Sequence, residues 1–479
     1  MADTLFWYDL ETFGRNPALD RVAQFAGIRT NDRFEPVGEP HVFYCAPTPD
    51  YVPDPLSCLI TGITPADAAA QGESEYRFVS RIRTLFLEPG TCVVGYNSLR
   101  FDDEFVRNML YRNFYDPYER EYTSGNSRWD IVDLMRAAHD FRPDGIEWPR
   151  NEEGKPSFKL EDLARANGVE QEKAHDALSD VRATIGLARL VHEKQPKLFR
   201  YVFSLRRKKK VYELIDLYHR RPFAYTSRVF SRQEGCTTAV APLAPNPRNP
   251  NEVLVYDLRY DPRPLIDASV EELRARIFTR DAAQRVPVTG VAVNRSPVIS
   301  PLSALERDGV AERLNINLNK CKEHAEMLAG EHRLTQKITQ VYDRPAEAGA
   351  RDPELQLYSG GFFPDSDREE FERIHRTSRE SIPRLQLSCE DPRVPELFRR
   401  FVWRNFEDLL SAEAMRKWRS FCASRILMPP GEDVSDFAFF SRKIDEHLAR
   451  SDLDGQAKIV LRKLADYRDY LKREVLEYR

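Results

Sequence analysis

The chain has 479 residues, of which 41% are hydrophobic and 31% charged, a length and composition that allow about three globular domains of about 150 residues each. No apolar run approaches the about 20 residues of a membrane span, and the N-terminus lacks the basic region and apolar core of a signal peptide, so we expect a soluble, cytoplasmic protein without a membrane partner. The net charge of −4 excludes a globally basic nucleic-acid binder, and the seven scattered cysteines, without a C-x-x-C pair, argue against a structural zinc site.

The first part of the chain, up to about residue 195, alternates strand-like with helical segments. Apolar and β-branched runs typical of strands lie at 5–10, 22–30, 41–47 and 91–97. Apolar residues recur at helical spacing in 101–114 and 176–193. Strands mixed with helices in this way predict an α/β layer fold.

The rest of the chain changes character twice. A basic run, RRKKK at 206–210, follows the first part, and we favour a solvated linker over a DNA contact. From there to about residue 345, short strand-like pieces punctuated by Pro and Gly suit a small β-barrel. From about residue 355, apolar residues recur at helical spacing. We therefore predict three domains, at 1–195, 196–350 and 351–479.

The stretch LFWYDLETFG places two carboxylates on an apolar strand. Asp9 and Glu11 are two residues apart, so the period of a strand puts both on one face, where like charges repel. Because burying an unpaired charge is costly, such a pair needs a counter-charge, and Mg²⁺ prefers oxygen ligands. D-x-E pairs are also common on solvated surfaces, so the prediction of a metal site rests on the apolar context.

Two later segments add candidate ligands. In VVGYNSLRFDDEF a strand ends near Tyr96 and Asp102 opens a helix, at a sheet edge where α/β sites gather. A helix N-terminus also favours Asp through its dipole, so this position has an ordinary explanation as well. In AHDALSDV, His175 precedes Asp180 by five residues, although a lone histidine is more often structural than catalytic.

Taken in order, Asp9-x-Glu11, Asn-x-x-x-Phe-Asp102 and His175-x-x-x-x-Asp180 resemble the three motifs of the DEDDh 3′→5′ exonucleases. The resemblance implies a ribonuclease-H-like fold, four acids that hold two metal ions and a histidine general base. Two Mg²⁺ ions, or Mn²⁺ as a substitute, would clamp the attacking and leaving oxygens of a phosphodiester. A neutral imidazole, with an ordinary pKa near 6.5, would accept the proton of water.

Longer segments are similar to the bacterial exodeoxyribonuclease I family over nearly the whole chain. They are ETFGRNPALDRVAQFAGIRT, LITGITP, RNFYDPYEREYTSGNSRWDIVDLMRA, KPSFKLEDLARANGV, APLAPNP and LYSGGFF. The family combines an exonuclease domain with an SH3-like barrel and a helical C-terminal domain. It degrades single-stranded DNA processively from the 3′ end, releases nucleoside monophosphates and serves DNA repair and recombination. Asp103 beside Asp102 is ambiguous, and the spacing from Asn97 favours Asp102.

The resemblance also implies DNA contacts. Single strands are held by basic grooves interleaved with aromatic side chains, on which bases stack. The candidate substrate contacts are Glu11, Lys159, Arg107, Tyr118, Tyr122 and Arg136. Lys159 stands where the family has a basic phosphate contact near the scissile end. Tyrosines at helical spacing are often core residues and a lone arginine is often a surface residue, so structural roles stay open.

The family further binds the acidic C-terminal tail of single-strand-binding protein, for which Arg142 and Tyr201 are the matching candidates. Such a tail needs charge pairing and a hydrophobic socket. We expect a monomer. Two other functions stay open: an RNA-trimming exonuclease with the same five residues, and a catalytically silent nucleic-acid-binding scaffold. The two extra domains argue against the first, and the intact set of acids and histidine argues against the second.

Overall fold

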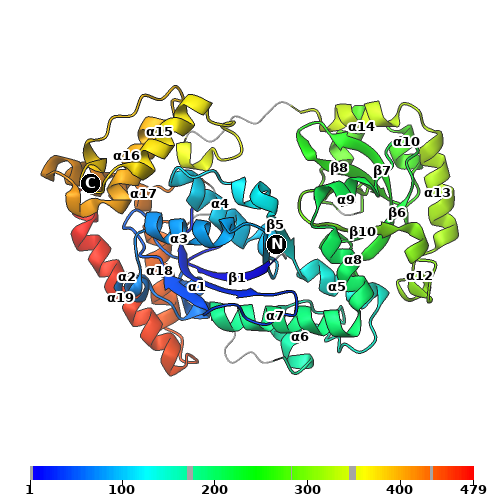
Figure 1. The fold of residues 1–479 in the computed structure, drawn as a ribbon, viewed down its shortest axis with the longest axis horizontal. Coiled ribbons are helices and arrows are strands. Elements are labelled where there is room, and N and C mark those ends of the chain that lie inside the picture. The colour runs from blue at the N-terminus through cyan, green and yellow to red at the C-terminus, as the bar shows by residue number, and fades with distance from the viewer. Residues whose placement is uncertain (1–3, 170–175, 282, 345–351, 432–434, 479) are drawn as a thin grey trace.

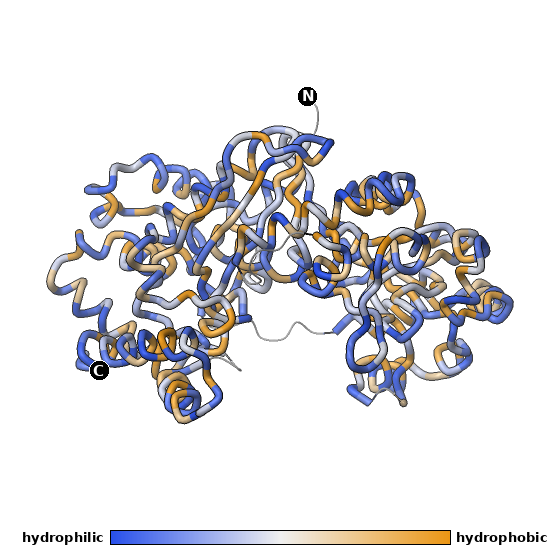
Figure 2. Tube along the Cα trace, turned by 90° about the horizontal axis from the view of Figure 1, so that it is seen from below, coloured by the Kyte–Doolittle hydropathy of each residue, from blue (hydrophilic) through white to orange (hydrophobic). Residues whose placement is uncertain are grey.

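The computed structural model describes residues 4–169, 176–281, 283–344, 352–431 and 435–478. Figure 1 shows the N-terminal part of the chain, in blue and cyan, between a green part on one side and a yellow-to-red part on the other. Figure 2, turned by 90°, shows the C-terminal end at one side of the molecule and the N-terminal end near its middle. Within the described ranges, no helix has the length and apolar character needed to cross a membrane.

The N-terminal part is built on a five-stranded mixed sheet of order β3-β2-β1-β4-β5. Its strands are β1 Thr4–Thr12, β2 Val22–Thr30, β3 His41–Tyr44, β4 Thr91–Gly95 and β5 Ser127–Asp130. β1 is antiparallel to β2 and parallel to β4, and β4 is parallel to β5. The carboxyl ends of these three parallel strands therefore lie at one edge of the sheet. All four strands predicted for this part are present.

Side chains of β1 alternate between two cores, as the period of a strand requires. Leu5 and Trp7 belong to the core shared with α7 (Ala177–Lys194). Phe6, Tyr8 and Leu10 belong to the core shared with α3 (Glu75–Leu87) and α4 (Asp102–Arg112). Figure 1 shows α7 on one side of β1, and α3 and α4 on the other. The helices of this part are α1 Pro55–Thr61, α2 Pro65–Gln71, α3 Glu75–Leu87, α4 Asp102–Arg112, α5 Val132–Phe141, α6 Leu160–Ala166, α7 Ala177–Lys194 and α8 Pro196–Ser204. β1 is thus a central strand buried on both faces.

The second part contains the predicted short strands, arranged as an antiparallel sheet of order β10-β6-β7-β8-β9. These strands are β6 Phe223–Thr226, β7 Thr237–Asn246, β8 Asn249–Asp257, β9 Val288–Ala292 and β10 Val298–Pro301. The accompanying helices are α9 Lys208–Tyr212, α10 Arg263–Asp267, α11 Val270–Ile277, α12 Val310–Arg313, α13 Leu318–Gly330 and α14 Leu334–Tyr342.

The C-terminal part is helical, as its apolar spacing predicts. Its helices are α15 Asp365–Arg376, α16 Val394–Asn405, α17 Ala412–Leu427, α18 Phe437–Leu448 and α19 Gly455–Glu474. Its buried residues form cores that continue into the N-terminal part. Phe114 packs with Phe371 and Phe401, and Cys58 shares a core with Leu461. The helical part is therefore anchored to the sheet domain by apolar packing.

Helix α8 and the basic run join the first two parts. Phe199 of α8 packs edge-on against Trp129 of β5, so α8 rests on the N-terminal core although it follows the predicted boundary at residue 195. In the run RRKKK, Arg207 donates to the carbonyl oxygens of Gly125 and Asn126 at 2.9 and 3.1 Å. This arginine thus forms part of the junction between the two domains.

A buried ion network joins the helical part to the sheet domain. Arg404 of α16 donates to Asp50 at 2.7 Å and to Glu354 at 3.0 Å. Burial alone would raise the pKa of Asp50, but Arg404 and Arg21 hold that pKa well below its ordinary value. Because removing one partner would leave a buried charge uncompensated, this network favours a single docked arrangement.

Candidate active site

Asp9 and Glu11 lie near the carboxyl end of β1, on the same face as Leu5 and Trp7, which precede them in the strand. That face is covered by α7, so the two carboxylates point toward this helix rather than toward α3 and α4. Glu11 is 7% exposed. The sequence prediction of one shared strand face is consistent with this arrangement.

Helix α7 brings the third carboxylate. Asp176 caps the helix by accepting a hydrogen bond from the backbone N–H of Ser179 at 3.1 Å, which places Asp180 in the first turn. One carboxylate oxygen from each of Asp9, Glu11 and Asp180 lies within 4.8 Å of the others. His175 lies outside the described residues, immediately before this helix cap.

The fourth carboxylate comes from α4. Asp102 is the first residue of that helix, is 4% exposed, and accepts a hydrogen bond from the backbone N–H of Leu10 at 3.2 Å. This bond ties Asp102 to β1 at the residue between Asp9 and Glu11. Four carboxylates from one strand and two helices are therefore gathered at one sheet edge.

Asp103, the ambiguous neighbour, turns away from this cluster. Its carboxylate accepts hydrogen bonds from Tyr8, Arg120 and Arg128 at 2.5, 2.8 and 2.5 Å. Burial alone would raise the pKa of Asp103, but Arg120 and Arg128 hold it well below its ordinary range. Asp103 is thus a buried structural anion, whereas Asp102, the residue that the spacing from Asn97 favours, contacts β1.

The electrostatics of the cluster fit a cation site. Burial raises the pKa of Asp9 well above its ordinary value, and the charges of Asp102, Glu11 and Asp180 raise it further. Burial, with Asp103, raises the pKa of Asp102 as well. Oxygen donors held this close repel one another as anions, and a bound divalent ion relieves that repulsion. The residues present therefore fit the metal ions that the motifs imply.

The candidate DNA contacts fall into two groups. Lys159 is exposed at the start of α6, and Tyr122 is 65% exposed, so both side chains are accessible. Arg136 is largely covered and pairs with Asp133 at 2.5 Å. Arg107 is 3% exposed, and its guanidinium donates to Glu121 at 2.8 Å.

Arg107 also donates to Glu104 and to the hydroxyl of Tyr358. The N–H groups of the Arg107 guanidinium are therefore directed at protein acceptors, and we do not propose Arg107 as a phosphate contact. Glu104 and Glu121 lie near Arg107 in the sequence, whereas Tyr358 comes from the helical part, and only the folded chain brings all three to the guanidinium.

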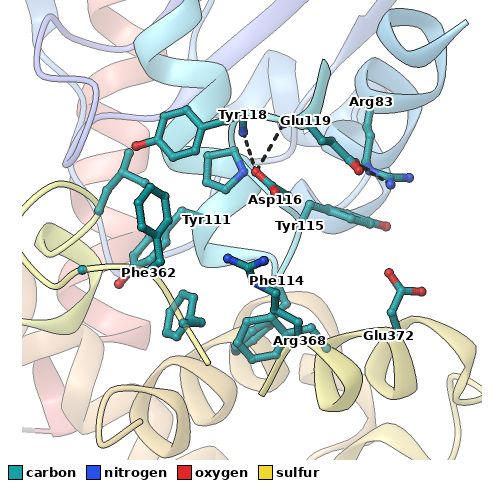
Figure 3. A pocket seen from close by; sticks show the side chains of 15 residues that line it. Arg83, Tyr111, Phe114, Tyr115, Asp116, Tyr118, Glu119, Phe362, Arg368 and Glu372 are labelled. Carbon is teal, nitrogen blue, oxygen red and sulfur yellow. Dashed lines mark hydrogen bonds and ion pairs between the residues drawn. The ribbon is translucent and has the colours of Figure 1, made fainter. Parts of the chain in front are cut away.

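Tyr118 lines a pocket between the sheet domain and the helical part (Figure 3). Phe362, which is 80% exposed, approaches it edge-on with the ring centroids 6.3 Å apart. Arg368 lines the same pocket. Sequence reasoning does not single out Phe362 or Arg368, although Phe362 lies in the stretch LYSGGFF that carries the family resemblance.

Arg142 and Tyr201 both lie where the sheet domain meets the second part. Arg142 follows the last turn of α5 and pairs with Asp308 at 3.1 Å, with 40% of its side chain exposed. Tyr201, on α8, donates to the carbonyl oxygen of Ile299 at 2.8 Å. Both candidates thus contact the second part of the chain, Arg142 at the segment before α12 and Tyr201 at β10.

Comparison with known proteins assigns each of the three parts of the chain to a protein family model. Residues 6–188 match the family model Exonuclease, 206–344 the Exonuclease I SH3-like domain, and 351–471 the Exonuclease I C-terminal domain. These matches confirm the predicted architecture of an exonuclease domain, an SH3-like barrel and a helical domain.

Exodeoxyribonuclease I of Escherichia coli (strain K12) is 43% identical over 423 residues, covering 87% of this chain and 88% of its own. The zinc-bound form of the E. coli ExoI–ssDNA complex aligns with a TM-score of 0.92 at 39% identity, covering 99% of this chain and 100% of that chain. A crystal structure of SSB/Exonuclease I with the inhibitor CFAM aligns with a TM-score of 0.91 at 39% identity, covering 98% of this chain and 100% of that chain. The chain therefore belongs to the exodeoxyribonuclease I family.

Proposed function

We propose that the protein is a 3′→5′ exonuclease that hydrolyses single-stranded DNA to nucleoside monophosphates during DNA repair and recombination in the cytoplasm. The observation that carries this proposal is the cluster of Asp9, Glu11 and Asp180 beside Asp102, at the sheet edge of a chain of this family. Four clustered acids suit metal-assisted hydrolysis of a phosphodiester.

The residues divide the chemistry among them. Asp9, Glu11, Asp102 and Asp180 would hold two Mg²⁺ ions, for which Mn²⁺ would substitute. When bound, such ions polarise the reacting oxygens and neutralise the charge that builds on phosphorus. His175, just before the cap of α7, would accept the proton of the attacking water.

The exposed Lys159 would contact a phosphate near the scissile end, and Tyr118 and Tyr122 would offer stacking faces upstream. Arg136 would join them after releasing Asp133, while Glu11 would also contact the terminal nucleotide. Stacking would contribute about 1 to 3 kcal/mol per base.

Two other functions are separated by one assay. Labelled DNA and RNA strands of matching sequence are incubated with the full chain and Mg²⁺, and the products are resolved by length. The proposal expects DNA to shorten from the 3′ end to mononucleotides. Faster RNA trimming would instead support an RNA exonuclease, and binding without cleavage would support a scaffold.

Both accessory domains contact the same residue beside the site, which supports a closed passage for the strand. Glu104, two residues after Asp102, accepts a hydrogen bond from Arg295 of the barrel domain at 3.0 Å. It also accepts one from the hydroxyl of Tyr358 of the helical domain. A single strand would thread such a passage, whereas a duplex is wider and carries two charged backbones.

This arrangement predicts strand selectivity and repeated cleavage without release. A substrate with a long 3′ overhang is bound, and Mg²⁺ is then added together with excess unlabelled trap strand. The overhang should shorten despite the trap and stall at the duplex junction, because release requires the passage to open. Arg295→Ala, which removes the barrel contact to Glu104, should shorten each run severalfold.

Arg280→Ala, an exposed arginine of the same domain, is the matched control and should leave the run length unchanged. Digestion of a blunt duplex at a comparable rate, or complete quenching by the trap, would show that the passage is open.

We further propose that the protein, acting as a monomer, binds the acidic C-terminal tail of single-strand-binding protein at Arg142 and Tyr201. Support comes from the exposed guanidinium of Arg142 and from the half-buried Tyr201 on α8, since both side chains contact the barrel domain. An acidic tail would compete with Asp308 for Arg142, since both offer a carboxylate.

Opposite effects are therefore expected from two substitutions in a titration with labelled tail peptide. Arg142→Ala should weaken binding about tenfold, which corresponds to one charged hydrogen bond of about 1.5 kcal/mol. Asp308→Asn should strengthen binding, because it removes the competing carboxylate. Equal affinities of wild type and Arg142→Ala would remove Arg142 from the site.

A further inference from the structure

A further buried carboxylate lies at the end of β5, the strand that follows β4 in the parallel part of the sheet. Asp130 is the last residue of β5 and is 7% exposed. One oxygen accepts hydrogen bonds from the backbone N–H groups of Asn97 and Val132 at 2.8 and 3.0 Å. The other accepts from the backbone N–H of Leu99 at 3.2 Å. Its three bonds thus join the end of β5, the start of α5 and the segment that precedes Asp102.

The backbone of residues 97–101 is irregular, so some of its N–H groups need hydrogen-bond acceptors from outside the segment. Asn97 adopts the left-handed conformation with φ of 59°, and a short 3-10 turn, Ser98–Arg100, follows before α4 begins. Backbone N–H groups in such a turn find no strand partner, and an unsatisfied buried N–H is costly. The carboxylate of Asp130 supplies the acceptors for two of them.

The position of this turn affects the carboxylate cluster through Asp102. This residue follows the turn directly, and its own carboxylate is bonded to the backbone of β1 between Asp9 and Glu11. A shift of the turn would therefore move Asp102 relative to the two carboxylates on β1. The negative charge of Asp130 also acts on Asp102, because it contributes to raising the pKa of Asp102.

We propose that Asp130 is a positioning residue that holds the turn of residues 97–101, and through it Asp102, in the arrangement that binds metal. This inference rests on the proposed two-metal nuclease function. Asp130 does not itself belong to the compact group of Asp9, Glu11 and Asp180. Its role is to satisfy backbone donors, as outer partners of metal ligands commonly do.

The test compares Asp130→Asn with wild type in the full chain. The amide keeps one oxygen acceptor but presents an N–H₂ group to one set of backbone donors, so the turn loses at least one bond. Mn²⁺ affinity is measured by titration calorimetry, and exchange of the backbone amides in 96–102 is followed by mass spectrometry. Loss of such a partner typically costs about 10- to 100-fold in metal affinity or activity.

We expect Mn²⁺ to bind about tenfold more weakly, the Mg²⁺ concentration for half-maximal cleavage to rise similarly, and amides 96–102 to exchange faster. Asp144→Asn, an exposed carboxylate in the loop after α5, should change none of these. Wild-type metal affinity and wild-type exchange in Asp130→Asn would overturn the proposal.

If Asp130→Asn does not fold, Asp130→Glu keeps the charge but displaces the carboxylate by one methylene. Weakened Mn²⁺ binding by this second variant would support the proposal, and unchanged binding would overturn it. An inactive wild-type protein that still binds Mn²⁺ would contradict the nuclease function without touching the role of Asp130.

Discussion

Asp9→Ala is expected to lower the rate of single-strand cleavage by at least about 10³-fold while leaving the fold and DNA binding largely intact. Metal ions contribute several kcal/mol to stabilising such a transition state, and each 1.36 kcal/mol corresponds to about tenfold in rate. Cleavage of a labelled single strand is measured in Mg²⁺, in Ca²⁺ and in EDTA. Ca²⁺ should support little cleavage, because its longer and looser coordination does not suit two closely spaced sites.

A stability measurement separates loss of metal from loss of fold. Asp9→Asn removes one of several mutually repelling charges, so in EDTA the variant should unfold at the same temperature as wild type or at a higher one. Mg²⁺ should raise the unfolding temperature of wild type more than that of the variant, since a ligand stabilises the state that binds it. Asp32→Asn, exposed in the turn after β2, is the control. Robust cleavage in EDTA would contradict metal dependence.

His175→Ala is expected to lower kcat by about 10²- to 10⁴-fold, the usual contribution of a general base. The base must be neutral to accept a proton, so wild-type kcat should fall at acid pH, where an imidazole becomes protonated. The variant should lose this acid limb. The measurement is the pH dependence of kcat on a single-stranded substrate at saturating Mg²⁺.

His219→Ala provides the matched control, because His219 is an exposed histidine paired with Asp216 outside the exonuclease domain. It should leave both kcat and the acid limb unchanged. A loss below threefold in His175→Ala would mean that another group removes the proton.

Local sequence patterns determined the elements that build the site. The alternation of Leu5, Trp7, Asp9 and Glu11 placed both acids on one face of β1, because side chains of a strand alternate whatever packs against it. Helical spacing and the small residues after Asp176 likewise determined α7. The order of three motifs along the chain then indicated a family, which comparison confirmed. Such features depend on neighbours within a few residues, so one sequence suffices to predict them.

Pairing between distant segments was decided only by the tertiary structure. Asp102 and Asp103 are adjacent in sequence, yet one contacts β1 and the other is neutralised by Arg120 and Arg128. Arg107 belongs to a basic and aromatic stretch, yet Tyr358 of the distant helical part engages its guanidinium in the folded chain, together with Glu121 of the same stretch.

Asp130 illustrates the same limit at the site itself. In sequence it is an ordinary acid between a tryptophan and an isoleucine, with no spacing that links it to the motif at 97–102. Its role follows from the parallel pairing of β4 with β5, which brings the ends of both strands together. Chain composition and local periodicity do not predict that pairing. Which buried strands become neighbours depends on how all the elements of the core pack together.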